Sequence, residues 1–316
     1  MNIIICTLFE KHYHYGLAAL TDSLYKNGFL GDIYAGYKGD LPDWSSSAVE
    51  NPALNWKGAR TMDVAQGLKI HFLPLHTDFH LANYKPDFML ELINGVGKEA
   101  EGIVYFDPDI VIKCKWDFYE TWMSFGVSLV HEIISNDMPA THPIRMGWGK
   151  VITRSNREIK RHITSYINSG FCGVLRENIE FLEVWSDIIR VAIKEFDFKS
   201  AEFAHSKRTD LFFAKDQDAF NIAAMCSNSP VSEMGPEGMD FINGGFTMSH
   251  AVGGAKPWVK NFISAAFKGV PATNADKAFW SSVDGPIKPY SAGQIKKKKI
   301  ALGISSFIGR FYSKNK

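Results

Sequence analysis

Cysteine is scarce in this chain of 316 residues, and its four cysteines lie far apart. They are Cys6, Cys114, Cys172 and Cys226. No two of them have the spacing of a structural zinc site, and three of the four stand in apolar strings. We therefore expect reduced thiols in the protein core, as is usual in the cytoplasm, rather than a fold held by disulfides.

Long apolar runs are absent as well. No run reaches the roughly 20 residues that a membrane-spanning helix needs. Residues 1–9 are apolar, but they lack the basic leader and the small-residue cleavage site of a signal peptide. We predict that they form the first strand of the core.

Acidic residues are missing from residues 285–316, which hold eight of the 35 lysines and arginines. The other 27 are outnumbered by the 34 Asp and Glu residues, so residues 1–284 carry a charge of −7 although the whole chain has +1. A nucleic-acid binder usually has basic residues across its folded face. The charge distribution therefore predicts no nucleic-acid partner, and the 46% hydrophobic content predicts a globular protein.

Apolar strings of strand length alternate with segments of helical periodicity. The predicted strands are residues 2–8, 31–35, 68–73, 125–131 and 166–175, with one more that runs into Asp107; the predicted helices are residues 15–25, 86–96, 179–193 and 217–225. This alternation predicts an α/β fold, with a mostly parallel sheet covered by helices on both faces and ligands bound beyond the carboxyl ends of the strands. We predict no defined elements in residues 38–66 and an inserted loop at residues 132–165.

The sequence Asp107-Pro108-Asp109 directly follows a buried strand. Two carboxylates one residue apart at a strand end can hold a hard divalent cation, which in turn can hold a diphosphate. The alternative is an acidic turn in which the carboxylates serve the local backbone. Because short motifs recur by accident, the motif alone does not decide between the two.

A second segment, which begins at His250, offers further ligands. A neutral imidazole completes a mixed oxygen and nitrogen coordination sphere, which suits Mn2+ better than Mg2+. Gly253 and Gly254 let backbone N–H groups approach an anion, and Lys256 can neutralise a phosphate. The alternative is a surface turn with a solvated lysine and Trp258 packed beneath it.

Two polar clusters could contact a sugar. Asp216 and Gln217 open a predicted helix, where Asp216 is also a natural N-cap. Asn168 stands at the start of the triplet Asn-Ser-Gly in a predicted strand, where a strand-end turn is the alternative. Lys85 precedes a predicted helix, and we interpret it as an exposed lysine rather than a phosphate contact.

Together these segments resemble a known family. The motifs are Asp107-x-Asp109, Asn168-Ser169-Gly170, Asp216-Gln217-Asp218 and His250-x-x-Gly253-x-x-Lys256-Pro257-Trp258. Their order and rough spacing are similar to those of the family 8 glycosyltransferases, which are retaining enzymes of the GT-A fold and include bacterial lipopolysaccharide galactosyl- and glucosyltransferases and the glycogenins. The resemblance covers about residues 1–265, and the segment from His to Trp is its most specific part.

The resemblance implies a metal-diphosphate site. It assigns Mn2+ (or Mg2+) to the ligands Asp107, Asp109 and His250. It assigns the diphosphate of a nucleotide-sugar donor to Lys256 and to the backbone of Gly253.

The resemblance also implies contacts to the rest of the donor and to the acceptor. Asn168, Asp216 and Gln217 contact the sugar, with Asp216 and Gln217 as the catalytic pair. Lys85 stands where the family often has Arg, which makes its phosphate contact monodentate. The loop that begins at Thr7 and ends at Tyr15 binds the nucleoside, although it lacks the short acidic pattern that family members often carry there.

The implied activity is transfer of a hexose from UDP-glucose or UDP-galactose to a hydroxyl of a bacterial surface glycan or a lipid-linked acceptor. Gln217 is neutral and a poor nucleophile, so a front-face displacement fits better than a covalent intermediate; retention itself rests on the resemblance. One alternative is a nucleotidyltransferase of sugar phosphates, which would need a glycine-rich loop that residues 7–15 lack. Another is a non-catalytic sugar-binding module.

The end of the chain differs from the rest. We predict a GT-A domain at residues 1–266, a linker rich in Gly, Pro and Ser at residues 267–294, and a basic amphipathic tail at residues 295–316. Such a tail lies on an anionic membrane surface and would place the protein in the cytoplasm, peripheral on the inner face of the cell membrane. The alternative is a disordered, solubilising tail.

Overall fold

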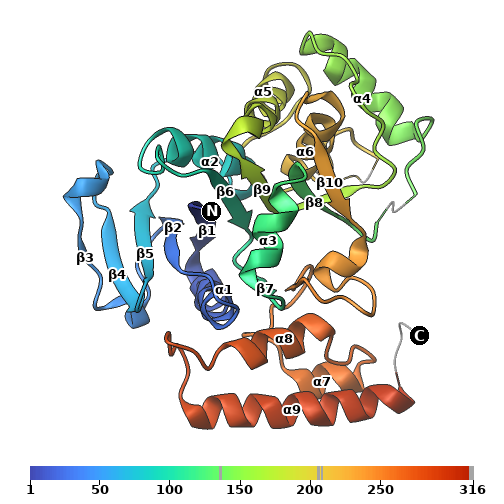
Figure 1. The fold of residues 1–316 in the computed structure, drawn as a ribbon. Helices are drawn as coiled ribbons and strands as arrows, with labels where there is room; N and C mark the ends of the chain where they lie inside the picture. Colours follow the sequence, from blue (N-terminus) through green and yellow to red (C-terminus); the bar gives the residue numbers. More distant parts are fainter. Residues whose placement is uncertain (135–136, 205–206, 208, 313–316) are drawn as a thin grey trace.

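A mixed β-sheet forms the centre of the computed structural model, which describes residues 1–134, 137–204, 207 and 209–312 (Figure 1). Within these residues the sheet has nine strands. In spatial order they are β10 (Val231–Met234), β8 (Val127–His131), β9 (Ile167–Leu175), β6 (Gly102–Phe106), β1 (Ile3–Glu10), β2 (Gly31–Lys38), β5 (Leu68–Pro74), β4 (Arg60–Ala65) and β3 (Val49–Glu50). The run β6-β1-β2-β5 is parallel, while β9 runs antiparallel to β6 and β8.

Helices cover both faces of the sheet, which confirms the predicted α/β fold (Figure 1). One face packs on α1 (His14–Lys26) and α3 (Trp116–Met123). The other packs on α2 (Lys85–Asn94), α4 (Pro143–Arg154), α5 (Glu180–Glu195) and α6 (Asp216–Cys226). Successive side chains of a strand point to opposite faces, so Ile3 and Ile5 join the first core and Ile4 and Cys6 the second.

Two segments have more structure than their sequences predict. Residues 38–66 contain β3, β4 and two 3-10 turns, η2 (Asp43–Ser45) and η3 (Pro52–Leu54), and they extend the sheet by antiparallel pairing. Residues 132–165, predicted as a loop, contain α4 with the fully buried Trp148. Both elements are weak in local propensity, because β3 is two residues long and α4 contains two glycines, so tertiary packing decides them.

The C-terminal region is a helical layer packed on α1 and on the short strand β7 (Ile110–Ile112) (Figure 1). Its helices are α7 (Phe262–Phe267), α8 (Asn274–Ser282) and α9 (Ala292–Phe311). Trp258, Phe279 and Trp280 form its core, and Ile295 and Leu302 attach α9 to it. The layer therefore has an apolar core that also includes Ala19 of α1 and Val111 of β7.

Part of the range predicted as a linker rich in Gly, Pro and Ser, residues 267–294, is helical in this layer. That range contains α8, which begins with a capping box between Thr273 and Asp276. The glycines and prolines of this range lie in the turns on either side of α8, except Gly293, which is in the first turn of α9. The tail predicted at residues 295–316 is helical as far as Phe311, and residues 313–316 lie outside the described residues. No helix in the described part of the chain has the length and hydropathy to span a membrane.

A buried carboxylate joins this layer to α1. Asp22 is 2% exposed, and it accepts hydrogen bonds from the backbone N–H groups of Ile287 at 2.9 Å and Gly285 at 3.2 Å. Burial raises the pKa of Asp22 to about 7, although these two bonds and Lys288 act in the opposite direction. The folded protein therefore favours the protonated carboxyl group.

We predict that Asp22 makes stability depend on pH. Its folded pKa lies above its unfolded value, so its contribution is complete below about pH 4 and is lost as pH rises to about 7. The unfolding free energy of the wild type, minus that of Asp22→Asn, should fall by up to about 4 kcal/mol over this range. Urea unfolding at stepped pH measures it.

Asp63→Asn is the matched control, because the Asp63 side chain is 82% exposed. The difference in unfolding free energy between the wild type and Asp63→Asn should not change with pH. A flat profile for Asp22→Asn as well would contradict the prediction.

Candidate active site

A cavity of about 600 Å3 opens at the carboxyl ends of β1 and β6, beside the start of β9. Its lining includes nine of the residues that the sequence analysis singled out: Lys85, Asp107, Asp109, Asn168, Asp216, Gln217, His250, Gly253 and Lys256. This is the edge of the sheet at which ligands of parallel α/β folds bind. The chain thus brings five distant segments to one cavity.

The pairing of two short strands brings the predicted metal ligands together. β7 follows Asp109 directly and pairs antiparallel with β11 (Met248–His250), with His250 opposite Ile110. Nε2 of His250 lies 3.2 Å from Oδ1 of Asp109 and 3.7 Å from Oδ2 of Asp107. One ligand atom from each of the three residues lies within 4.8 Å of the others, so the group could hold a divalent cation.

The space around these ligands is shaped by a glycine of β9. A Cβ atom on Gly170 would lie 2.5 Å from Cε1 of His250 and 2.9 Å from Oδ2 of Asp107. The backbone of Gly170 also accepts a hydrogen bond from the N–H of Asp107 at 2.7 Å. Only glycine leaves room for the imidazole and the carboxylate to face one another here.

The charges at this group suit a cation. Burial by itself raises the pKa of Asp109, but His250 and Lys256 outweigh it and hold that pKa well below its usual range. Nζ of Lys256 lies 2.6 Å from Oδ2 of Asp109 and donates to the carbonyl of Ala251 at 2.7 Å. Asp109 is therefore deprotonated, as a metal ligand must be. Nδ1 of His250 is buried and has no hydrogen-bond partner among the described residues.

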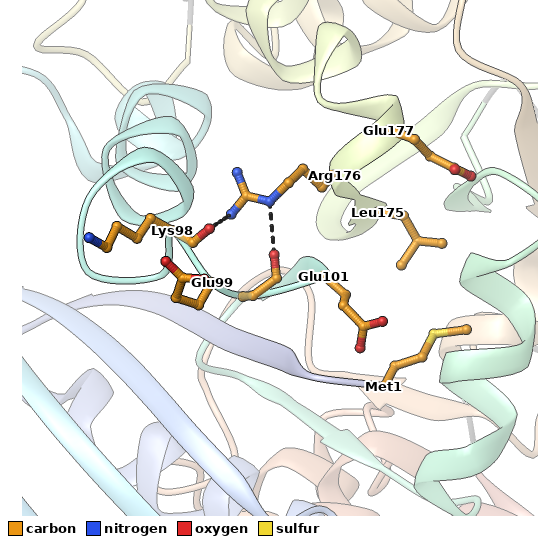
Figure 2. A pocket seen from close by; sticks show the side chains of 8 residues that line it. Met1, Lys98, Glu99, Glu101, Leu175, Arg176 and Glu177 are labelled. Atoms are coloured by element: carbon orange, nitrogen blue, oxygen red, sulfur yellow. Dashed lines mark hydrogen bonds between the residues drawn. The ribbon is translucent and has the colours of Figure 1, made fainter.

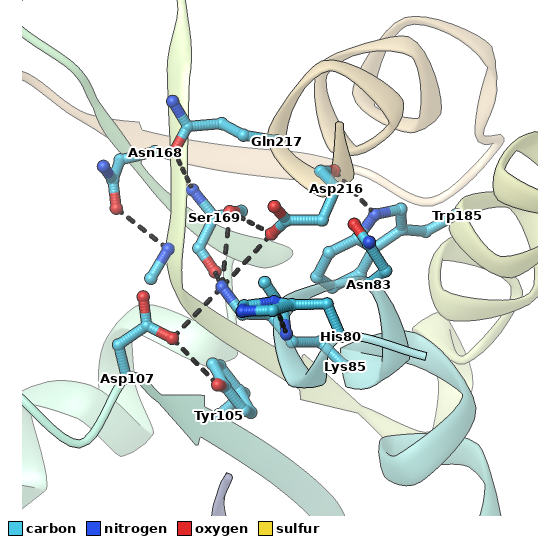
Figure 3. Close-up of polar contacts among 12 residues, drawn as sticks. His80, Asn83, Lys85, Tyr105, Asp107, Asn168, Ser169, Trp185, Asp216 and Gln217 are labelled. Carbon is cyan, nitrogen blue, oxygen red and sulfur yellow. Dashed lines mark hydrogen bonds and ion pairs between the residues drawn. The ribbon is translucent and has the colours of Figure 1, made fainter. Parts of the chain in front are cut away.

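Lys85 is the centre of the second half of the site (Figure 3). It is 3% exposed, so its interpretation as an exposed lysine is wrong. Its Nζ lies 3.1 Å from Oδ1 of Asp107 and 3.2 Å from Oδ2 of Asp216, and it donates to the carbonyl of Ser169 at 3.1 Å. Burial disfavours the ammonium, but the two carboxylates outweigh it and raise the pKa of Lys85. The residues beside Lys85 in the sequence indicate only that a lysine stands where a helix begins. Its burial results from packing against segments that are distant in the sequence.

The predicted sugar contacts form a hydrogen-bonded row along the start of β9 (Figure 3). Ser169 donates from Oγ to Asp216 at 2.7 Å and from its backbone N–H to Oε1 of Gln217 at 3.1 Å. Asn168 donates to Glu132 at 2.6 Å and accepts from the N–H of Gly170 at 2.8 Å. Asp216 and Asp107 share one cation, the ammonium of Lys85. Burial raises the pKa of Asp216, although Lys85 acts in the opposite direction.

Thr7 and Tyr15, which mark the ends of the predicted nucleoside loop, do not line the cavity, but other residues of the loop do. Thr7 is fully buried inside β1, and Tyr15 stacks on Tyr290 with ring centroids 5.1 Å apart. Neither belongs to the described lining, in which Leu8, Phe9, Glu10 and Tyr13 represent this loop.

Sequence reasoning also missed Glu132 and Tyr105. Glu132 directly follows the strand β8, which is the same signal that marked Asp107. Tyr105 donates to Oδ1 of Asp107 at 2.8 Å. Because it stands inside an apolar strand, nothing in the sequence distinguishes it from the other core residues.

A separate cavity of about 470 Å3 lies at the amino ends of β1 and β6, around Arg176 (Figure 2). The guanidinium of Arg176 donates to four backbone carbonyls, those of Ile93, Gly97, Lys98 and Ala100. These bonds hold the end of α2 against the sheet. We assign Arg176 a structural role.

Solved glycosyltransferase structures share this fold over nearly the whole chain. The bifunctional glycosyltransferase WbbM matches with a TM-score of 0.54 and 14% identity over 94% of this chain. GlyE of Streptococcus pneumoniae TIGR4 matches with 0.51 and 12% over 95%, and an active-site mutant of LgtC with 0.52 and 13% over 93%. The chain spans 51% of WbbM, 64% of GlyE and 99% of LgtC.

These similarities establish the class of fold, that of the GT-A glycosyltransferases, as the sequence motifs predicted. No protein-family model matches the sequence, and no curated protein matches it either. The acidic pair and the histidine could hold the divalent cation that the motifs implied.

We predict that Gly170→Ala weakens Mn2+ binding by about 10–100-fold, because the added methyl group would force His250 away from Asp107. Gly254→Ala is the control, since a Cβ there meets nothing within 4 Å. Isothermal titration with Mn2+ compares the three proteins. Equal affinity of Gly170→Ala and the wild type would show that these residues do not form the metal site.

Proposed function

We propose that the protein is a metal-dependent glycosyltransferase that moves a hexose from a nucleotide diphosphate sugar, UDP-glucose or UDP-galactose, to an acceptor hydroxyl. The observation that carries this proposal is the convergence of Asp107, Asp109 and His250 on a cavity that also holds Lys85 and Lys256. The similarity of the fold to that of solved glycosyltransferases supports the same proposal.

The lining of the cavity suggests how a donor would lie. Tyr13 is half-buried in the lining and would contact the base, while Glu10 beside it can accept from a base N–H. Gly253 lines the cavity with a φ of +76°, a conformation that favours glycine, and Lys256 provides a cation for the diphosphate. Asn168, Asp216 and Gln217 would then face the sugar hydroxyls.

The residues present favour a front-face displacement over a covalent intermediate, whereas retention rests on the family resemblance. A divalent cation bound by the Asp, Asp and His group would stabilise the charge of the departing diphosphate. Gln217 is neutral, and Asp216 is engaged by Lys85 and Ser169, so neither offers a free carboxylate for a covalent intermediate. Lys256 and the backbone around Gly253 hold the leaving group, and the oxygen that leaves can take the proton of the acceptor hydroxyl.

The surface of α9 favours a lipid-linked acceptor or a bacterial surface glycan made at the membrane. Ile300, Ile304, Phe307 and Phe311 repeat at intervals of four, three and four residues and are all exposed. The four lysines of α9 have two kinds of surroundings. Lys298 donates to the carbonyl of Lys260 and lies over Trp280, so it packs inward. The other three, Lys296, Lys297 and Lys299, are exposed. This face would bind the anionic inner surface of the cell membrane and make the enzyme peripheral and cytoplasmic.

Two other functions remain as alternatives. A nucleotidyltransferase of sugar phosphates would need a glycine-rich phosphate loop after β1, where this chain has the sequence Glu10 to Tyr13 without glycine. A non-catalytic sugar-binding module would have no use for the buried charges at Asp109 and Lys85, which are costly to bury.

We predict that the protein with Mn2+ releases a nucleoside diphosphate from UDP-glucose or UDP-galactose, and that Asp109→Asn reduces turnover by about 100–1,000-fold. Asp63→Asn, at an exposed position, is the control. Release of pyrophosphate would instead indicate the nucleotidyltransferase. No release from any nucleotide sugar would favour the binding module.

We also predict that Lys296→Gln, Lys297→Gln and Lys299→Gln together weaken binding to anionic vesicles by roughly 100-fold, since each lysine contributes about 1 kcal/mol. These substitutions spare the buried Ile295 and Leu302, which a deletion of α9 would remove. Co-sedimentation with vesicles measures the effect. The control replaces the exposed Lys57, Lys98 and Lys150, and equal loss in both triple variants would contradict a specific role for α9.

A further inference from the structure

Lys215 is a fully buried lysine that directly precedes Asp216 and Gln217. Its backbone has φ 32° and ψ −95°, which non-glycine residues rarely adopt. Such a conformation persists only where the surrounding structure imposes it, and it is common beside functional sites. The contacts of the Lys215 side chain show which neighbours impose this conformation.

The Lys215 ammonium is held by a segment that covers the cavity. We call residues 198–204 the strap. Nζ of Lys215 lies 3.1 Å from Oε2 of Glu202, donates to the carbonyl of Lys199 at 2.9 Å, and lies 5.4 Å from the centre of the Phe198 ring. A buried ammonium is stable only with such partners, so the strap and Lys215 depend on one another.

The strap is also tied to the segment before Lys85. This segment is the 3-10 turn η4 (Leu81–Tyr84) together with His80. The backbone N–H of His80 donates to the carbonyl of Ser200 at 2.9 Å. The Asn83 amide donates to the carbonyls of Ser200 at 2.7 Å and Glu202 at 2.9 Å. The strap therefore bridges the two chain segments that carry the Lys85–Asp216 ion pair.

The strap contributes directly to the cavity as well. Phe203 and Ala204 belong to the lining, and the Phe203 ring lies 5.2 Å from that of His80. From the other side, the indole N–H of Trp185 donates to the carbonyl of Asp216 at 3.0 Å (Figure 3). The turn at Asp216 is thus held between Trp185 in the core and Lys215 under the strap.

We propose that Lys215, through Glu202, is a positioning residue for sugar transfer: it holds the strap over the donor sugar and fixes the direction of Asp216 and Gln217. This inference rests on the proposed function for its catalytic part. Without the ammonium, the strap loses its attachment to the turn. The turn in return loses the contact that holds the backbone of Lys215 at a positive φ, which non-glycine residues rarely adopt. The metal group lies in the turn between β6 and β7 and at the end of β11, and it is not part of this contact.

The test uses Lys215→Met, Glu202→Gln and the double variant, with Lys194→Met as the control on an exposed position of α5. Glu202→Gln is the safer variant for folding, because the Glu202 side chain is 47% exposed. We expect amide hydrogen exchange to rise at least tenfold in residues 198–204 and 214–217 in both single variants. Mn2+ affinity should remain that of the wild type. The double variant should resemble Lys215→Met, because that variant already removes the contact between Lys215 and Glu202.

With the donor that the wild type turns over, we expect kcat to fall by 10–100-fold while affinity for Mn2+ with UDP changes less than threefold. Unchanged exchange in the strap, or raised exchange with an unchanged kcat, would overturn the proposal. If the wild type turns over no nucleotide sugar, the proposed function fails separately. Exchange and Mn2+ affinity then still decide whether Lys215 holds the strap.

Discussion

One buried ammonium links the two halves of this cavity. Lys85 lies between Asp107, in the acidic turn after β6, and Asp216, at the start of α6. Without a cation between them, two buried carboxylates would repel one another, and removal of one partner leaves an uncompensated charge that is strongly destabilising. Asp107 directs one oxygen to Lys85 and the other toward His250. The placement of the proposed metal ligands and that of the proposed sugar contacts therefore depend on the same ion pair.

The C-terminal helices support this cavity from below. Gly16 of α1 packs so closely on the acidic turn that a Cβ would lie 2.1 Å from the carbonyl oxygen of Pro108. Trp258 donates to His12 at 3.0 Å, and Trp280 donates to the carbonyl of Pro257 at 3.1 Å, so the turn that carries Lys256 rests on the helical layer. The helix α9, whose outer face carries exposed apolar residues and lysines, is thus packed on the same layer as the turn that carries Lys256. In the proposed function, this geometry would orient the cavity relative to a lipid surface.

Prediction from the sequence succeeded where local pattern and tertiary role coincide. Strands buried on both faces are continuous apolar runs, and α5 repeats its apolar residues at helical spacing, so β1, β5, β9 and α5 were recognised. It failed where packing overrides a weak local signal. The helices α4 and α8 stand among glycines, prolines and serines, and their stability comes from Trp148 and Trp280 in the core. Lys85 was interpreted as exposed because the neighbouring sequence contains no information about Asp107 and Asp216, the two carboxylates that the fold places beside it.

The sequence by itself determined the chemistry available: an acidic pair after a strand, an imidazole, a glycine turn and two polar clusters, in an order that resembles one family of transferases. Only the tertiary structure decided which of them meet. The antiparallel pairing of β7 and β11 sets His250 beside Asp109, and it brings Lys256 to a carboxylate 147 positions away in the chain. The physical reason is that a residue's type and its near neighbours determine local propensity and charge, whereas distance, burial and the pKa depend on partners that only the folded chain brings into contact.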